Sequence, residues 1–183
     1  MLLVRGGDER HIYSEPWEKF IALRHEHLKA LIVETGGLGR SKIAQILSLQ
    51  LPALEHLELW LGSDEYGGNS SIDDFMLIFS GDLFPKLTYL GLRNSEYSDS
   101  IATTLVNFPI INTIKVLDLS FGNLGDDGAE ALLNCPAVNQ LDILNLYDSC
   151  LTEEMVGRLK LLDVEVIADT EKEPGDRYCS VSE

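Results

Sequence analysis

The fold is decided by the stretch PIINTIKVLDLSFGNLGDDGAEALL, which runs from Pro109 to Leu133. Aliphatic residues first recur with a period of two, as in a half-buried strand, and then with a period near 3.6, as in an amphipathic helix. A glycine between the two parts allows a tight turn. The stretch therefore predicts a short strand, a turn and a helix. Its key positions are Ile114, Leu117, Leu119, Gly122 and Leu124.

The same spacing returns along the chain. Moved on by 27 residues, the key positions become Leu141, Leu144, Leu146, Ser149 and Leu151. This recurring pattern is typical of leucine-rich repeats. We therefore predict an α/β fold, a leucine-rich-repeat solenoid arc with a parallel sheet on the concave face and helices on the convex face. The central positions of the predicted strands are Leu31, Leu57, Leu90, Leu117, Leu144 and Val164.

Helices are predicted between these strands, because apolar residues there recur at helical spacing. Four prolines each follow a predicted helix and force the chain toward the next strand: Pro52, Pro85, Pro109 and Pro136. A further helix is predicted over about residues 15–25, where serine and proline precede an apolar pattern. The predicted cap residues of the other helices are Ser41, Ser71, Ser98, Asp126 and Thr152.

One repeat domain is predicted over residues 1–168, with about six repeats. Leu2 lies 29 residues before Leu31, so residues 2–4 are expected to form an edge strand beside residues 31–33. The first repeat is expected to be incomplete. Residues 169–183 form an acidic tail, which either caps the last repeat or is disordered.

The composition restricts the possible partners. The net charge of -16 argues against nucleic acid, because nucleic-acid binding depends on lysine and arginine that neutralise phosphates. The same charge disfavours an anionic membrane surface. A basic protein partner is compatible with it, although solubility alone explains the charge equally well.

The cellular location is predicted from what the sequence contains. No apolar run approaches the ~18 residues of a transmembrane helix. The start of the chain lacks the layout of a secretory signal. Its three cysteines are an odd number without paired spacing, which favours a reducing compartment and hence the cytoplasm.

Several segments resemble one bacterial family of leucine-rich-repeat proteins with ribonuclease-inhibitor-like repeats. The most specific are the paired WLG and YGG segments at residues 60–62 and 66–68; the others are residues 33–38, 51–59, 90–95 and 117–120, with the closing Tyr178, Val181 and Glu183. The likeness extends over roughly residues 2–183. Some family members carry an N-terminal WGR domain, but this sequence has no Trp-Gly-Arg string. The family has no established activity, so the resemblance implies a fold rather than a function.

A candidate binding surface follows from the strand alternation, because every second residue faces away from the core. The predicted partner-binding residues of this concave face are Glu34, Glu58, Trp60, Arg93, Asp118, Asn145 and Tyr147. Asp118 and Asn145 are expected to be exposed there.

Trp60 and Arg93 have the same phase in neighbouring repeats, so their side chains are expected to stack. Tyr147 has this phase two repeats further on, with Ser120 between, which predicts an open groove. Tryptophan, tyrosine and arginine dominate binding hot spots. The alternative is that these side chains only cover one another.

An inserted loop over residues 61–70 is predicted to form a rim above this face, with Asp64, Glu65 and Tyr66 as candidate contacts. Asp64 and Glu65, together with Asp73 and Asp74, offer a weaker hypothesis of a cation site, although their spacing does not fit an EF-hand. The His25-Glu26-His27 segment has alternating histidines, as in a metal site on a strand, but no third metal ligand is recognisable. No catalytic motif and no cofactor site is recognised.

Three functions therefore remain open from the sequence. The first is a non-catalytic protein-interaction module that uses the concave face and the loop rim. The second is a metal-dependent enzyme built on the acidic 64–74 loop. The third is a structural C-terminal domain of a longer protein.

Overall fold

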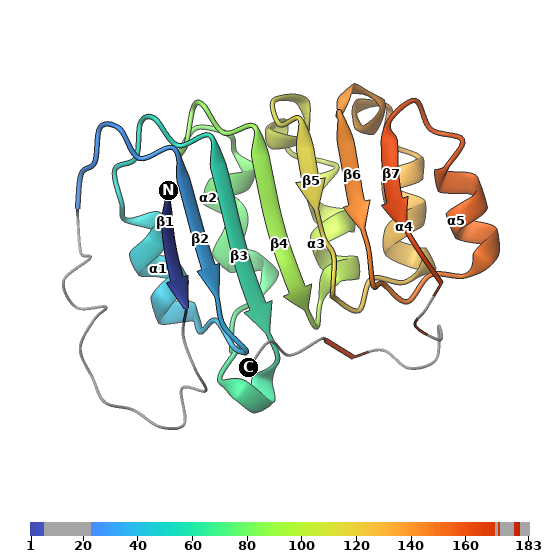
Figure 1. The fold of residues 1–183 in the computed structure, drawn as a ribbon, viewed down its shortest axis with the longest axis horizontal. Coiled ribbons are helices and arrows are strands. Elements are labelled where there is room, and N and C mark those ends of the chain that lie inside the picture. The colour runs from blue at the N-terminus through green and yellow to red at the C-terminus, as the bar shows by residue number, and fades with distance from the viewer. Residues whose placement is uncertain (6–22, 171, 173–177, 180–183) are drawn as a thin grey trace.

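The computed structural model describes residues 1–5, 23–170, 172, 178 and 179, and within them the chain forms one seven-stranded sheet. The strands lie in the order of the chain, and each is parallel to the next (Figure 1). The prediction of an α/β fold with a parallel sheet is confirmed. The strands are β1 (Leu2–Arg5), β2 (Ala30–Glu34), β3 (His56–Gly62), β4 (Tyr89–Ser95), β5 (Val116–Asp118), β6 (Ile143–Leu146) and β7 (Glu165–Ala168).

Five α-helices of the described residues lie on one face of this sheet (Figure 1). We call the opposite face, which none of these helices covers, the open face. The helices are α1 (Arg40–Leu47), α2 (Met76–Phe79), α3 (Ser98–Leu105), α4 (Asp126–Leu133) and α5 (Glu153–Leu159). Short 3-10 segments are η2 (Asp64–Tyr66), η3 (Ile72–Phe75), η4 (Pro109–Asn112) and η5 (Pro136–Gln140). None of the described helices is both long and apolar enough to cross a bilayer.

A repeated hydrogen-bond pattern sets the strands in register. The backbone carbonyl just before one strand accepts two consecutive N–H groups at the start of the next strand, at 2.7–3.2 Å. This arrangement recurs at equivalent positions, so equivalent residues of successive strands lie side by side. The accepting carbonyls belong to Lys29, Glu55, Thr88 and Lys115.

The core forms between the sheet and the helices as the alternation predicts. Leu117 and Leu119, with their equivalents Leu144 and Leu146, are fully buried. The predicted edge strand is also confirmed, since β1 pairs with β2 from Leu2–Leu31 onward.

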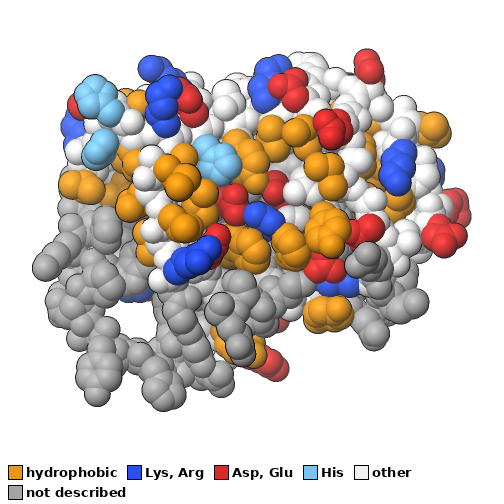
Figure 2. Space-filling model, in the orientation of Figure 1, with side chains coloured by type: hydrophobic (Ala, Val, Ile, Leu, Met, Phe, Trp, Pro, Cys, Tyr) orange, Lys and Arg blue, Asp and Glu red, His pale blue; other side chains and the backbone are white. Residues whose placement is uncertain are grey.

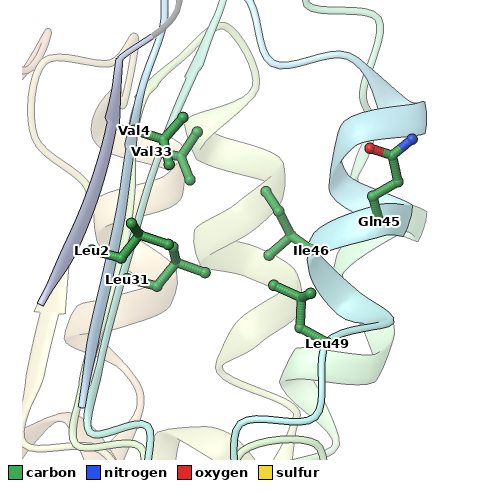
Figure 3. Close-up of a pocket in the computed structure, with 7 residues that line it drawn as sticks. All are labelled: Leu2, Val4, Leu31, Val33, Gln45, Ile46 and Leu49. Carbon is green, nitrogen blue, oxygen red and sulfur yellow. The ribbon is translucent and has the colours of Figure 1, made fainter. Parts of the chain in front are cut away.

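At the β1 end of the core, side chains from β1 and β2 point toward α1 and surround a small cavity (Figure 3). Within the described residues, the side-chain oxygen of Gln45 is buried there without a hydrogen-bond partner. The lining residues are Leu2, Val4, Leu31, Val33, Gln45, Ile46 and Leu49.

The predicted register of the last strand is wrong by two residues. Val166 rather than Val164 pairs with Leu144, and Ile167 pairs with Asn145. Val164 and Val166 are two residues apart, so their side chains point to the same face of the strand and alternation alone fits either pairing.

Two of the five predicted caps are confirmed. Ser71 forms a capping box with Asp74, and Thr152 accepts a hydrogen bond from the Met155 N–H. The N-cap residues of α1, α3 and α4 are instead Gly39, Tyr97 and Gly125.

Side chains of adjacent repeats bind the N–H groups at these other helix starts. Asp99 of α3 accepts from Gly125 N at 2.8 Å and from Gly128 N at 3.2 Å, both at the start of α4. Asn69 accepts from Arg40 N at the start of α1 in the same way. Each repeat therefore helps to cap its neighbour. The helix predicted over about residues 15–25 falls mainly outside the described residues, and Leu23–His25 contains no helix.

Leu119→Ala should lower the free energy of unfolding by about 2–5 kcal/mol, because a fully buried leucine leaves a cavity when it is truncated. Urea denaturation followed by circular dichroism measures this. Leu161→Ala, at a leucine 85% exposed, is the matched control and should change stability by less than about 0.5 kcal/mol. Similar losses for both variants would contradict the assignment of Leu119 to the core.

Candidate functional site

Two carboxylates lie at the centre of the open face. Glu58 of β3 and Asp118 of β5 stand two strands apart, with Gly91 of β4 paired to both. We call Glu58 and Asp118 the buried acidic pair, because they are only 7% and 3% exposed. The predicted exposure of Asp118 is therefore wrong. Its position in the register is correct, but other side chains of the open face cover it.

Glu58 is held mainly by groups from its own and the next strand. Its Oε1 atom accepts from the Arg93 guanidinium at 2.6 Å and from the Trp60 indole N–H at 2.8 Å. Its Oε2 atom lies 3.4 Å from both the Tyr89 hydroxyl and His56 Nε2. Each carboxylate oxygen thus has two polar neighbours, which offsets the cost of burying the charge.

Asp118 is enclosed in a similar way. Its Oδ2 atom accepts from the Tyr89 hydroxyl at 2.7 Å and from the Asn145 amide at 2.9 Å. Its Oδ1 atom accepts from the hydroxyl and the backbone N–H of Ser120 at 2.6 and 3.0 Å. Arg93 Nε, which donates to the Ser120 hydroxyl at 3.0 Å, lies 3.7 Å from Asp118. Arg93 therefore links the two carboxylates.

The absence of a side chain at Gly91 makes room for this network. A Cβ atom there would lie 3.1 Å from Tyr89 Cε1 and 3.2 Å from Glu58 Cγ, closer than most such contacts. Tyr89 can therefore lie across the face and reach Asp118. The ring of Tyr89 also stacks on His56, with 3.8 Å between ring centroids.

The network fixes the protonation of two of its members. Burial raises the pKa of Glu58, but contacts from His56, Trp60 and Arg93 outweigh this and lower it from 4.5 to about 2. Burial and the neighbouring charge of Asp118 raise the pKa of the Tyr89 hydroxyl above its usual range. At neutral pH, Glu58 is ionised and Tyr89 is a neutral donor.

Beside the acidic pair lies a group that we call the aromatic cluster, made of Trp60, Arg93, Phe121 and Tyr147. The Arg93 guanidinium carbon lies 4.5 Å from the Trp60 ring centroid and 4.9 Å from that of Phe121. Trp60 and Phe121 stack at 5.4 Å, and Phe121 meets Tyr147 edge-on at 5.4 Å. Figure 2 shows hydrophobic side chains across the centre of the open face, with acidic and basic side chains among them.

The aromatic cluster confirms one prediction and corrects another. Trp60 and Arg93 are paired on adjacent strands and stack, as predicted. The open groove predicted between Arg93 and Tyr147 is wrong, because the Phe121 ring contacts both Arg93 and Tyr147. Ser120, which was expected to leave that gap, is fully buried and bonded to Asp118.

Phe121 has a left-handed backbone conformation, with φ of 64°. Asn94 and Asp148 have the same conformation, with φ of 55°, at positions 27 residues before and after it. Asparagine and aspartate tolerate this region, whereas it is a genuine outlier for a bulky residue. It costs roughly 1–2 kcal/mol for an L-residue with a Cβ. The sequence does contain a signal for this residue. Phenylalanine stands at position 121, whereas the equivalent positions 27 residues before and after it hold asparagine and aspartate.

Lys172 holds the turn at Phe121 from outside the sheet. Its buried ammonium donates to the carbonyls of Phe121 and Gly122 at 3.5 and 3.4 Å, and to that of Tyr178 at 3.2 Å. It also pairs with the Asp148 carboxylate at 3.3 Å. The left-handed turns after β5 and β6 are therefore tied together by one side chain.

The remaining predicted site residues do not join this group. Glu34 pairs with Arg5 at 2.7 Å near the β1 edge. Asp64, Glu65 and Tyr66 form η2, which extends past the carboxyl end of β3 (Figure 1). Asp64 and Glu65 are exposed, and Tyr66 is half-buried. The structure thus brings together six of the seven predicted residues of the face and leaves Glu34 apart.

The alternative cation site gains nothing from the geometry. In the part of the chain that the structure describes, no three His, Cys, Asp or Glu side chains are grouped to hold a metal ion. Asp74 is bonded to Arg40 and to Ser71. His25 Nδ1 accepts from the His27 N–H at 3.3 Å.

The fold is similar to that of a protein from Bacteroides fragilis whose crystal structure has been determined, with a TM-score of 0.78 and 28% sequence identity. The match covers 86% of this chain and 46% of the other, so this chain spans less than half of that protein's length. No family model matches the chain. No curated protein matches it either.

Acid titration tests the Glu58 contacts. The folded-state pKa lies below the unfolded value, so the stability that Glu58 contributes is present above pH 4.5 and is lost as the pH falls toward about 2. Over this pH window, the free energy of unfolding should fall by on the order of 3 kcal/mol more in the wild type than in Glu58→Gln. Glu65→Gln, the same charge change on an exposed side chain, serves as the control. Equal pH slopes for wild type and Glu58→Gln, measured by urea denaturation, would refute these contacts.

Proposed function

We propose that this chain is a leucine-rich-repeat solenoid and that the open face is its concave face. Support comes from the parallel register of equivalent residues, the recurring carbonyl contacts and the helices on one face. The sequence resemblance to bacterial ribonuclease-inhibitor-like repeats adds to this, as does the similarity to the Bacteroides fragilis structure. We propose a cytoplasmic location, supported by an odd number of cysteines without paired spacing, which favours a reducing compartment.

We further propose that the protein is a non-catalytic module that binds another protein through the aromatic cluster. The observation that carries this proposal is the strained backbone of Phe121. Asparagine or aspartate would adopt this turn with less strain, as Asn94 and Asp148 do at equivalent positions. The phenylalanine costs stability, and its ring lies half-buried on the open face. Strain of this kind is concentrated at functional sites.

The chemistry of the cluster also favours binding. Rigid, half-exposed aromatic rings and an oriented arginine are the groups that dominate protein interfaces. The buried acidic pair and Ser120 fix the guanidinium of Arg93 from beneath. The surface is therefore ordered before any partner arrives, which reduces the entropy lost on binding.

The alternative is that these side chains only cover one another. Trp60 and Arg93 already cover each other, so a covering role would not require a strained phenylalanine beside them. The metal-dependent enzyme is not proposed, because no geometry in the described 64–74 loop favours it.

Phe121→Asn should separate binding from folding. Asparagine suits the left-handed turn, so the free energy of unfolding should change by no more than about 1 kcal/mol. Loss of the ring should weaken partner capture by about 2 kcal/mol, roughly 30-fold. Trp60→Ala should have a similar effect on capture. Affinity capture from a lysate of the source organism, quantified by mass spectrometry beside melting curves, measures both effects.

Leu77→Ala is the matched control, because Leu77 is 61% exposed and lies on α2, on the opposite side of the sheet. It should retain every partner that the wild type captures. A partner retained equally by wild type, Phe121→Asn and Trp60→Ala would end the proposal for this surface.

A further inference from the structure

We propose that the segment bound by the aromatic cluster is basic, and that one of its arginine side chains stacks on Phe121 and Tyr147. This inference rests on the proposed function and adds the chemistry of the partner. Three observations carry it: the charge of the open face, the charge of its border at the carboxyl ends of the strands, and the way in which the aromatic cluster already holds the Arg93 guanidinium.

The strand residues on the open face carry an excess of negative charge. Four are acidic, namely Glu34, Glu58, Asp118 and Glu165, and two are basic, namely Arg5 and Arg93. Both arginines are already paired, Arg5 with Glu34 and Arg93 with the acidic pair. The acidic pair thus has two carboxylates for one guanidinium. Its uncompensated charge lies directly beside the aromatic rings and favours a cation there.

The border at the carboxyl ends of the strands is also acidic. The segments between β2 and α1, β3 and η3, β4 and α3, β5 and α4, and β6 and α5 cover residues 35–39, 63–71, 96–97, 119–125 and 147–152, and the second of them includes η2. They contain no lysine or arginine. Their charged residues are Asp64, Glu65, Glu96 and Asp148.

At the opposite border the charges are mixed, and Lys29 pairs with Glu55 at 2.9 Å. Among the described residues, the basic side chains at the carboxyl-end border are Arg5, Arg40 and Lys172, and each is paired with a carboxylate: Arg5 with Glu34, Arg40 with Asp74 and the buried Lys172 with Asp148. The aromatic cluster lies between the buried acidic pair and this acidic border, because Trp60 and Arg93 are near the carboxyl ends of β3 and β4 and Phe121 and Tyr147 follow β5 and β6. It therefore lies between two sources of negative potential, which is where a partner's cation is most stabilised.

Arg93 demonstrates that these rings accept a guanidinium. It lies within 5 Å of two ring centroids, at 4.5 Å from Trp60 and 4.9 Å from Phe121. The next two rings, Phe121 and Tyr147, meet at an interplanar angle of 73°. Their arrangement forms a corner, in which a second guanidinium can stack on one ring and contact the edge of the other. Tyr147 is 39% exposed, so this corner is accessible from solvent.

Selection of a random dodecapeptide phage library on the immobilised full chain tests the inference. Counter-selection against Phe121→Asn removes peptides that bind elsewhere, and Leu77→Ala serves as a positive control that should retain the selected peptides. The expected result is that peptides captured by wild type and Leu77→Ala, but not by Phe121→Asn, are enriched in arginine over the unselected library.

Each result has a distinct meaning. Selected peptides that are neutral or acidic would overturn the basic partner while leaving the aromatic cluster as a binding surface. Absence of any peptide that distinguishes wild type from Phe121→Asn would overturn both the partner chemistry and the proposed function.

A direct measurement then tests the arginine itself. The most enriched peptide and its citrulline counterpart, which keeps the shape but lacks the charge, are compared by fluorescence polarisation. Citrulline should weaken binding by about tenfold, as expected for one cation–aromatic contact in a negative field. Tyr147→Leu should reduce the difference in affinity between the arginine peptide and the citrulline peptide, because it removes a ring on which the guanidinium stacks. Equal binding of both peptides would refute the inference even if the binding is tight.

Discussion

Parallel pairing of equivalent residues is the constraint on which the rest of this structure depends. At the start of each of β3 to β6, two N–H groups are bound by the carbonyl just before the preceding strand, so a residue keeps its phase from one repeat to the next. Aliphatic side chains of one phase then stack into the core, as Leu90, Leu117 and Leu144 do. Residues of the alternate phase must stack on the open face, whatever their chemistry.

This constraint creates the central problem of the open face. The register that buries the leucines also brings Glu58, Gly91 and Asp118 into one row. Two carboxylates two strands apart repel each other unless a cation lies between them. Arg93 supplies it, and Gly91 leaves space for Tyr89 to donate to Asp118. The acidic row is therefore stable only as part of a network that fixes Arg93 in one position.

Sequence reasoning succeeded where one periodicity determines the outcome. The alternation of Leu117 and Leu119 defines the core side of β5, and the equal phase of Trp60 and Arg93 places them together. It failed where the period leaves a choice, since Val164 and Val166 both fit the last strand. It also failed at helix starts such as that of α4, whose N–H groups are bound by Asp99 of the previous repeat.

The site was harder to predict than the fold for a physical reason. The burial of Asp118 depends on Tyr89 crossing the space above Gly91, and no pattern along one strand encodes that crossing. Phe121 was missed because alternation assigns the face position to Ser120. A left-handed residue reverses the expected direction of the side chain and brings the ring onto the face.

The strained turn also explains how the fold and the candidate site depend on each other. The Phe121 N–H donates to the Tyr147 carbonyl at 2.9 Å, and its own carbonyl is bound by Lys172. The left-handed conformation is therefore held from the next repeat and from the tail, rather than by the preference of the residue itself. This fixes the ring between Trp60 and Tyr147. Under the proposed function, rings that are already fixed lose little side-chain entropy in a complex, which would offset the stability lost to the strained turn.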